Sequence, residues 1–230
     1  MIRLANVSKY YDVKGTRRYL FRDVNLTIPT GTNVGIVGRN GAGKSTLLRM
    51  LGGIDFPSSG RIETHKRISW PVGLGGGFQG SLTGRENARF VCRLYNLDRQ
   101  QIREKLAFIE EFSELGRYLD MPIKTYSSGM RSRLTFSTSM AFDFDYYIFD
   151  EVLSVGDQFF KKKCEEMIQK IRETRHILMV SHGMPQLQRL CDCGVLIQDG
   201  ELHYFDDIRE AVAVYQGRQV PGGGPRVATA

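Results

Sequence analysis

A glycine-rich segment at residues 38–45 has the residue types and spacing needed to hold phosphate groups. It reads Gly-Arg-Asn-Gly-Ala-Gly-Lys-Ser, and it lies between an apolar run and a helix-like stretch. Glycines let a backbone curl until many N–H groups point at one polyphosphate, and the positive end of the following helix attracts the same anion. Lys44 can reach the outer phosphates, and the Ser45 hydroxyl can bind Mg²⁺. The segment predicts a site for a nucleoside triphosphate with magnesium.

An ordinary glycine turn is the alternative interpretation of this segment, and the order of strand, loop and helix around it argues against that alternative. We call residues 38–45 the phosphate loop. The residues expected to contact the nucleotide here are Gly38, Arg39, Asn40, Gly41, Ala42, Gly43, Lys44, Ser45 and Thr46.

Two carboxylates follow a second apolar run. Residues 146–149 are Tyr-Tyr-Ile-Phe, and Asp150 and Glu151 come next. Short continuous apolar runs are typical of strands buried in a parallel sheet. Asp150 would hold Mg²⁺ through its water shell, and Glu151 would orient the water that attacks the γ-phosphate, because phosphoryl transfer depends on positioning and charge neutralisation. Acidic pairs at strand ends are common, so this pair indicates phosphoryl chemistry only in combination with the phosphate loop.

The elements that must position these residues follow from the remaining pattern. Residues 2–7 and 20–28 are predicted strands joined by a polar connection, and residues 177–180 form another buried strand. Residues 84–140 are predicted to be helical, with a capping box from Asp98 to Gln101. Asp199 and Gly200 predict a hairpin, and a helix is expected over about residues 206–216.

Composition indicates a folded protein of ordinary hydrophobicity. The chain has 230 residues, of which 41% are hydrophobic, and it contains no apolar run of about 18 residues and no signal-peptide core. We therefore expect a cytoplasmic protein. The net charge of +7 suits nucleic acid, an anionic membrane face or simple solubility. Residues 161–163, three lysines in a helical stretch, are expected to form a solvated face.

A third motif points to a family. Residues 126–133 read Tyr-Ser-Ser-Gly-Met-Arg-Ser-Arg and open a predicted helix, so they form a second anion site. This segment resembles the ATP-binding-cassette (ABC) signature, usually L-S-G-G-Q, at Ser127 and Gly129, and it departs from it at residues 126, 128 and 130. Residues 154–157 are similar to the D-loop of that family, and His182 is similar to its switch histidine.

The resemblance implies an α/β fold: the P-loop NTPase fold of ABC ATPases, with a RecA-like core, a small antiparallel β-subdomain and an inserted helical subdomain. It implies one nucleotide-binding domain over residues 1–216, with the helical subdomain at about 84–140 and a disordered tail at 217–230. Catalytic roles fall on Lys44, Glu151 and His182.

Further residue roles carried over from the family concern the ligands. ATP would be contacted by Tyr11, Gln79, Ser127, Ser128, Gly129 and Asp157 in addition to the phosphate loop. Mg²⁺ would be held by Ser45, Asp150 and Gln79. Either Tyr10 or Tyr11 could stack on adenine, and Gln79 is either the Q-loop glutamine or a purely structural residue.

In this family the phosphate loop of one subunit faces the signature helix of the other across ATP. The chain holds one copy of each motif. The resemblance therefore implies a homodimer of nucleotide-binding subunits that binds two ATP molecules and closes when they bind.

Residues 67–87 and 121–133 closely resemble the ATP-binding subunits of bacterial capsular-polysaccharide exporters, the KpsT type. This implies a peripheral protein at the cytoplasmic face of the inner membrane, paired with two permease subunits, that drives a lipid-linked polysaccharide outward. The alternatives are an exporter of another glycan, such as O-antigen or teichoic acid, and a soluble ABC ATPase acting on nucleic acid or ribosomes. A small-molecule kinase would leave Ser127, Gly129 and His182 unexplained, and we expect no nucleic-acid partner.

Overall fold

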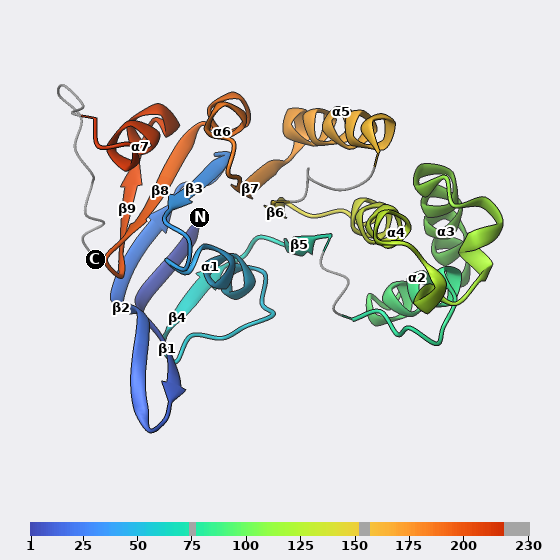
Figure 1. Cartoon of the computed structure of the whole chain (residues 1–230), viewed down its shortest axis with the longest axis horizontal. Helices are drawn as coiled ribbons and strands as arrows, with labels where there is room; N and C mark the ends of the chain where they lie inside the picture. The colour runs from blue at the N-terminus through green and yellow to red at the C-terminus, as the bar shows by residue number, and fades with distance from the viewer. Residues whose placement is uncertain (74–76, 152–156, 219–230) are drawn as a thin grey trace. The chain divides into compact units, whose positions relative to one another are not determined.

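A computed structural model describes residues 1–73, 77–151 and 157–218 of the chain (Figure 1). The chain divides into two compact units. The first unit contains Met1–Pro71, Phe144–Glu151 and Gln169–Ala230, and the second contains Val72–Asp143 and Val152–Ile168. The predicted tail at 217–230 lies outside the described residues from residue 219 onward.

The first unit is built on a six-stranded sheet. Its strands lie in the order β5 (Ile68–Val72), β6 (Tyr146–Asp150), β7 (His176–Val180), β3 (Val34–Gly38), β8 (Cys193–Gln198) and β9 (Glu201–Phe205). The pairs β6–β7, β7–β3 and β3–β8 are parallel, and β8–β9 is the predicted hairpin around Asp199 and Gly200. Parallel strands end at the same edge of a sheet, so the segments that follow β6, β7 and β3 emerge together.

A separate antiparallel sheet has the order β2 (Thr16–Ile28), β1 (Ile2–Val13) and β4 (Ser59–Thr64). The predicted strand bounds, 2–7 and 20–28, were too short, and a tight turn at Lys14 and Gly15 replaces the expected polar connection. The exposed ends of both strands are held by side chains across the hairpin. The rings of Tyr10 and Tyr19 lie 5.2 Å apart, and the Arg17 guanidinium lies 4.7 Å from the Tyr10 centroid.

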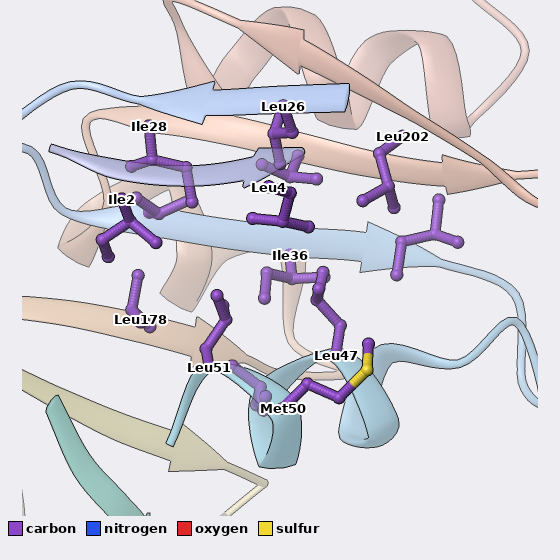
Figure 2. Packing of buried hydrophobic residues seen from close by; sticks show 14 of the residues in the cluster. Ile2, Leu4, Leu26, Ile28, Ile36, Leu47, Met50, Leu51, Leu178 and Leu202 are labelled. Carbon is purple, nitrogen blue, oxygen red and sulfur yellow. The ribbon is translucent and has the colours of Figure 1, made fainter. Parts of the chain in front are cut away.

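The core of the first unit lies between the two sheets and α1 (Lys44–Leu51). Figure 2 shows Leu4 and Leu26 of the antiparallel sheet pointing toward Ile36 of β3 and Leu47 of α1, and all four side chains are buried. The neighbouring residue Gly35 points to the opposite face of β3. A Cβ atom there would lie 2.5 Å from the Cδ1 atom of Ile208 in α7 (Ile208–Tyr215), so a larger residue would require the Ile208 side chain to move.

The second unit is mainly helical. It contains α2 (Gly84–Leu94), α3 (Arg99–Ser113), α4 (Ser128–Met140) and the first turns of α5 (Gln158–Thr174), together with short 3₁₀ turns at Gly116–Asp120 and Ile123–Thr125. The capping box from Asp98 to Gln101 is present at the start of α3, as predicted. The rings of Phe112, Phe136 and Phe160 meet at centroid distances of 5.8–6.1 Å and join α3, α4 and α5.

Among the described residues, no helix is long and apolar enough to cross a membrane. The remaining helix of the first unit is α6 (Met184–Leu190), which begins two residues after His182. The four cysteines, Cys92, Cys164, Cys191 and Cys193, are buried and form no disulfide.

Candidate functional site

The phosphate loop joins the end of β3 to the start of α1, as the sequence predicted. Gly41 and Gly43 have positive φ angles of 80° and 101°, which L side chains rarely adopt. Gly43 is the residue before α1, and no side chain caps that helix, so its first N–H groups remain available to an anion. The Lys44 ammonium donates hydrogen bonds to the carbonyls of Gly38 and Arg39 at 2.9 and 3.0 Å. The Lys44 side chain therefore lies against the phosphate loop.

The phosphate loop packs against a buried aromatic residue that the sequence patterns did not predict. Phe21 of β2 is 1% exposed, and a Cβ atom on Gly43 would lie 2.7 Å from the Cζ atom of its ring. Because the ring is packed in the core, it has no room to move away. The apolar character of Phe21 in a strand carried no signal of this contact, which depends on how the antiparallel sheet lies against β3.

The contact predicts different costs for two alanine substitutions in the loop. Gly43→Ala and Gly41→Ala both place a side chain at a positive φ, which costs about 1–2 kcal/mol each. Only Gly43→Ala also drives a methyl group into the Phe21 ring, since nothing lies within 4 Å of a Cβ at Gly41. We expect Gly43→Ala to destabilise the chain by about 1–3 kcal/mol more than Gly41→Ala in urea unfolding. Equal losses of stability in the two variants would show that the Phe21 ring does not restrict the side chain at residue 43.

The two carboxylates and the histidine meet at the same edge of the sheet. In the strand register, Asp150 pairs with Val180, and Val180 pairs with Ile36, so β6 and β7 end level with each other and β3 continues two residues further, to Gly38. The His182 Nε2 atom lies 2.9 Å from the Glu151 Oε1 atom. Both side chains are open to solvent, with exposed fractions of 64% and 44%. Two of the three predicted catalytic residues, Glu151 and His182, are thus in direct contact.

The backbone of Glu151 is unusual. Its φ angle is 57°, in the left-handed region that non-glycine residues seldom enter, and its N–H donates to the Val180 carbonyl at 3.1 Å. Such conformations cost free energy and cluster at functional sites. This turn aims the carboxylate toward the segment that follows β7, where His182 lies.

The residues at this edge fit a magnesium ion chemically. Asp150 ends β6 and is half-buried, and Ser45 opens α1 directly after Lys44. Both side chains offer hard oxygen ligands, which Mg²⁺ prefers, and Mg²⁺ keeps several waters when it binds few protein groups. The strand register places Asp150 at the edge where the phosphate loop leaves β3, and Ser45 follows that loop at the start of α1.

The aromatic residue predicted to stack on adenine is Tyr11. Tyr11 is 43% exposed on β1, with the Lys9 ammonium 5.3 Å from its ring centroid. A cleft of about 1020 Å³ borders the phosphate loop at residues 39–42, and its wall includes Tyr19 of β2 but not Tyr11. Tyr11 stays the residue predicted to stack on adenine. Tyr19 is an aromatic neighbour of the phosphate loop that was not predicted from the sequence.

The remaining predicted site residues lie in the second unit. Ser127 caps α4, where its hydroxyl accepts the Met130 N–H at 3.2 Å, and Ser128 and Gly129 form the first turn of the helix. Nothing but the Ser127 hydroxyl lies within 4 Å of a Cβ at Gly129, so this helix tip is open. Gln79 is exposed, and its backbone N–H and carbonyl are held by the Asn87 amide.

Of the D-loop segment, residues 154–156 lie outside the described residues and Asp157 lies within them. The structure thus joins Lys44, Ser45, Asp150, Glu151 and His182 at one edge of the first unit. The helix tip at residues 127–129 and Asp157 belong to the second unit.

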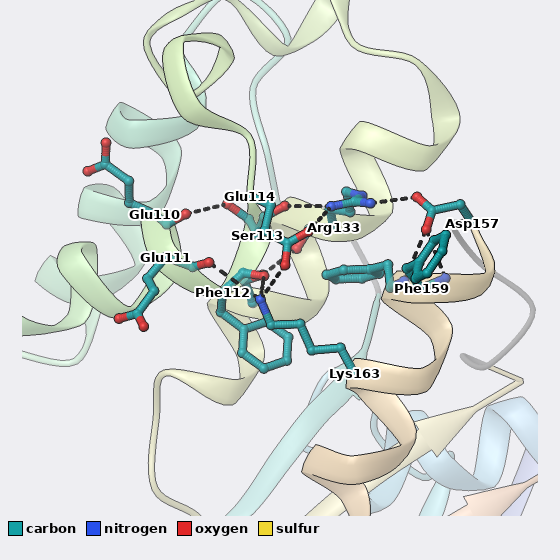
Figure 3. A network of polar contacts seen from close by, with 11 residues as sticks. Glu110, Glu111, Phe112, Ser113, Glu114, Arg133, Asp157, Phe159 and Lys163 are labelled. Carbon is teal, nitrogen blue, oxygen red and sulfur yellow. Dashed lines mark hydrogen bonds and ion pairs between the residues drawn. The ribbon is translucent and has the colours of Figure 1, made fainter.

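Asp157 is held within the second unit by a group of polar contacts around Arg133 (Figure 3). The Arg133 Nη2 atom donates to the Asp157 Oδ2 atom at 2.5 Å, and its Nη1 atom donates to the Glu114 carboxylate at 3.0 Å. The hydrogen bond from Arg133 lowers the pKa of Asp157 to about 2. The Lys163 ammonium binds the other Glu114 oxygen at 2.7 Å. The expectation of a wholly solvated face at residues 161–163 is therefore wrong for Lys163.

Comparison with known proteins agrees with these motifs. Residues 21–154 match the family model described as ABC transporter. The chain is 54% identical over 217 residues to the polysialic acid transport ATP-binding protein KpsT of Escherichia coli, covering 94% of this chain and 99% of that protein. It is 44% identical to the capsule polysaccharide export ATP-binding protein CtrD of Neisseria meningitidis serogroup B, covering 94% and 98%.

A solved structure resembles the fold. The dimeric ATP-binding cassette MJ0796, bound to ADP and Pi in a post-hydrolysis state, superposes with a TM-score of 0.76 at 22% identity, covering 91% of this chain and 99% of that one. The expected α/β fold of ABC ATPases, with its antiparallel sheet, is thereby confirmed. With its phosphate loop, acidic strand end and capped serine-glycine helix in place, the chain belongs to the ABC transporter family and is an ABC-type ATPase.

Proposed function

We propose that this chain is the ATP-hydrolysing subunit of an exporter that moves a lipid-linked capsular polysaccharide across the bacterial inner membrane. The observation that carries the proposal is the 54% identity to a protein named for polysialic acid transport, an identity that extends over 99% of that protein's length. A second relative, at 44% identity, is named for capsule polysaccharide export. O-antigen or another glycan remains the alternative cargo.

The residues at the sheet edge have different roles in ATP hydrolysis. Lys44 binds the outer phosphates by exchanging its bonds to the Gly38 and Arg39 carbonyls for bonds to phosphate oxygens. Glu151 orients the attacking water, and His182, 2.9 Å away, holds the Glu151 carboxylate and contacts the γ-phosphate. Ser45 and Asp150 would hold Mg²⁺, which supplies charge neutralisation on the phosphates.

Two copies of the chain complete each nucleotide site. One copy supplies the phosphate loop, and the other supplies the helix tip at Ser127 and Gly129, whose N–H groups and dipole favour phosphate. ATP stabilises the closed dimer because it binds both positive helix ends at once, and hydrolysis removes that link. The homodimer pairs with two permease subunits at the cytoplasmic face of the inner membrane.

A nucleic-acid function is the competing proposal, and the net charge of +7 favours it. It predicts salt-sensitive binding to DNA or RNA and ATP turnover that rises when either is added. The export proposal predicts no such stimulation.

Export is tested by replacing the chromosomal gene with a Glu151→Gln variant in the bacterium that encodes the chain. We expect polysaccharide to accumulate inside the cell and to disappear from its surface, because a closed dimer that cannot hydrolyse ATP cannot complete a transport cycle. Affinity purification of the unmutated chain from detergent extracts should recover a protein with several membrane spans. Normal surface polysaccharide in the variant, with no membrane protein recovered, would contradict the proposal.

A further inference from the structure

The paired ends of β1 and β2 project beyond β4, which pairs with β1 only as far as Ser8 (Figure 1). Pairing at these ends is regular, with Tyr10 opposite Tyr19 and Tyr11 opposite Arg18. Residues directly opposite each other lie on one face of a two-stranded sheet, and consecutive pairs alternate between the two faces. Tyr11 and Arg18 therefore share one face of the hairpin, and the other two tyrosines share the opposite face.

The rings of Tyr10 and Tyr19 are already covered by arginines of the same chain. The Arg17 guanidinium lies 4.7 Å from the Tyr10 centroid, and the Arg22 guanidinium lies 4.2 Å from the Tyr19 centroid. The two rings also lie 5.2 Å from each other. These distances are typical of cation–π and aromatic pairs. A flat ligand on this face of the hairpin would have to displace one of these partners.

Tyr11 is different, because only one side of its ring has a partner. The Lys9 ammonium lies 5.3 Å from the ring centroid, and it is held there by Asp55 at 2.6 Å and by the Phe56 carbonyl at 2.9 Å. Tyr11 is 43% exposed, and it makes no other ring contact within the part of the chain that the structure describes. The second side of the Tyr11 ring is therefore available to a flat ligand.

Arg18, across the hairpin from Tyr11, has an unused guanidinium. The residue is exposed, and its side chain has no hydrogen bond, ion pair or ring contact with any described residue. Its neighbours Arg17 and Arg22 both stack on tyrosines. A guanidinium is planar and stacks on aromatic rings, and it also binds anions. An open aromatic ring and an unpaired guanidinium thus share one face of the hairpin.

This face is continuous with the face of the sheet on which Phe21 lies. Lys9 and Tyr11 are two residues apart on β1, and their 5.3 Å contact confirms that their side chains lie on one face. Lys9 pairs with Phe21, and the irregularity that follows adds Leu20 to β2 without changing the alternation along β1. The Phe21 side chain therefore lies on the same face as Tyr11 and Arg18.

Two contacts within the first unit place this face beside the phosphate loop and α1. The Phe21 ring is the group that a Cβ atom on Gly43 would meet at 2.7 Å, and Lys9 is held by the turn that follows α1. Arg18 precedes Phe21 by three residues, which corresponds to about 10 Å along a strand. The base of a nucleotide whose phosphates lie in the loop extends away from the loop by a comparable distance.

We propose that Arg18 is a nucleotide-binding residue that acts together with Tyr11. The adenine base lies against the open side of the Tyr11 ring, and the Arg18 guanidinium stacks on the base from across the hairpin. The proposal rests on the ATPase part of the proposed function, in which Lys44 binds the phosphates, and it does not depend on the transported polysaccharide. We call these two residues the adenine pair.

The central test compares ATP binding by Arg18→Gln and Arg17→Gln in titration calorimetry. Arg18→Gln should raise the Kd for ATP about 2- to 30-fold, because it removes a cation that stacks on the base. Arg17→Gln is the matched control, since it removes the same charge from the neighbouring residue, whose guanidinium already stacks on Tyr10. The control should bind ATP within about twofold of the unmutated chain.

Inorganic triphosphate separates a contact with the base from a general effect of charge. It carries the phosphates of ATP without adenine, so Arg18→Gln should bind it as tightly as the unmutated chain does. Lys44→Ala should weaken the binding of ATP and of inorganic triphosphate alike. A loss of triphosphate affinity in Arg18→Gln as large as its loss of ATP affinity would overturn the proposal, because the arginine would then act on the phosphates.

A double-mutant cycle tests whether the two residues of the adenine pair act together. Tyr11→Ala should raise the Kd for ATP about 5- to 150-fold, because it removes the ring on which the base stacks. Arg18→Gln should then cost less in the Tyr11→Ala background than in the unmutated chain, since the base is no longer held against the arginine. Independent, additive losses would contradict a shared contact with one base.

Melting temperatures measured without nucleotide check that the hairpin is intact. Arg18→Gln should leave the melting temperature unchanged, because its side chain has no partner among the described residues. If Arg18→Gln binds ATP as tightly as Arg17→Gln does while Lys44→Ala binds it weakly, the adenine pair is wrong and the proposed function stands. If Lys44→Ala binds ATP as tightly as the unmutated chain, the proposed role of the phosphate loop fails as well.

Discussion

Glu151→Gln is expected to lower ATP turnover by about 10²–10⁴-fold while leaving ATP binding intact. The substitution keeps the shape of the side chain and the backbone bond to Val180, and it removes the charge that would orient the attacking water. A glutamine amide still fits beside His182, which lies 2.9 Å from the carboxylate. Because binding continues without hydrolysis, the variant should accumulate as a nucleotide-bound dimer.

Turnover is measured by phosphate release, and ATP binding by titration calorimetry. The matched control is Glu63→Gln, a glutamate whose side chain is 41% exposed, against 44% for Glu151, and which contacts Arg61 as Glu151 contacts His182. The control should hydrolyse ATP at the unmutated rate. Turnover near that rate in Glu151→Gln as well would show that this carboxylate does not orient the water.

Lys44→Ala is expected to weaken ATP binding about 10- to 150-fold. The ammonium would make charged hydrogen bonds to the outer phosphates, and such bonds contribute about 1.5–3 kcal/mol, which corresponds to that range of Kd at room temperature. Without ATP the same ammonium binds the Gly38 and Arg39 carbonyls, so the loop also loses a support. Titration calorimetry measures the affinity directly.

Lys44→Met controls for the loss of the aliphatic part of the lysine side chain. It keeps an unbranched apolar chain and removes the charge, so its ATP affinity should match that of Lys44→Ala. Melting temperatures measured without nucleotide identify any part of the loss that comes from a disturbed loop. Unchanged affinity in both variants, with the loop still folded, would be incompatible with a phosphate-binding role for Lys44.

Local patterns in the sequence predicted the parts of this molecule that depend on neighbouring residues. The phosphate loop, the apolar strand that ends at Asp150, the capping box at Asp98 and the hairpin at Gly200 each follow from spacing within a few residues. The ends of β1 and β2 were missed because most of their residues are exposed and several are charged, and ring and guanidinium contacts across the hairpin extend the pairing.

Contacts between distant residues could not be derived in the same way. The distance between Glu151 and His182 depends on β6 and β7 being adjacent and in register, which no local pattern states. The same holds for Phe21 beneath Gly43 and for Arg133 beside Asp157, since an apolar strand residue and a helical arginine have many possible partners. The family resemblance supplied roles for Glu151 and His182, and the register shows how they meet.

Mixing two inactive variants tests most directly whether each nucleotide lies between two copies of the chain. Lys44→Ala has a defective phosphate loop and an intact α4 tip, and Ser127→Arg has the reverse. In a head-to-tail dimer, one of the two sites of a mixed pair combines the intact loop with the intact tip. The account predicts that the mixture hydrolyses ATP well above the sum of the two separate variants. A mixture that stays inactive, or a Ser127→Arg variant that hydrolyses ATP at the unmutated rate as a monomer, would contradict it.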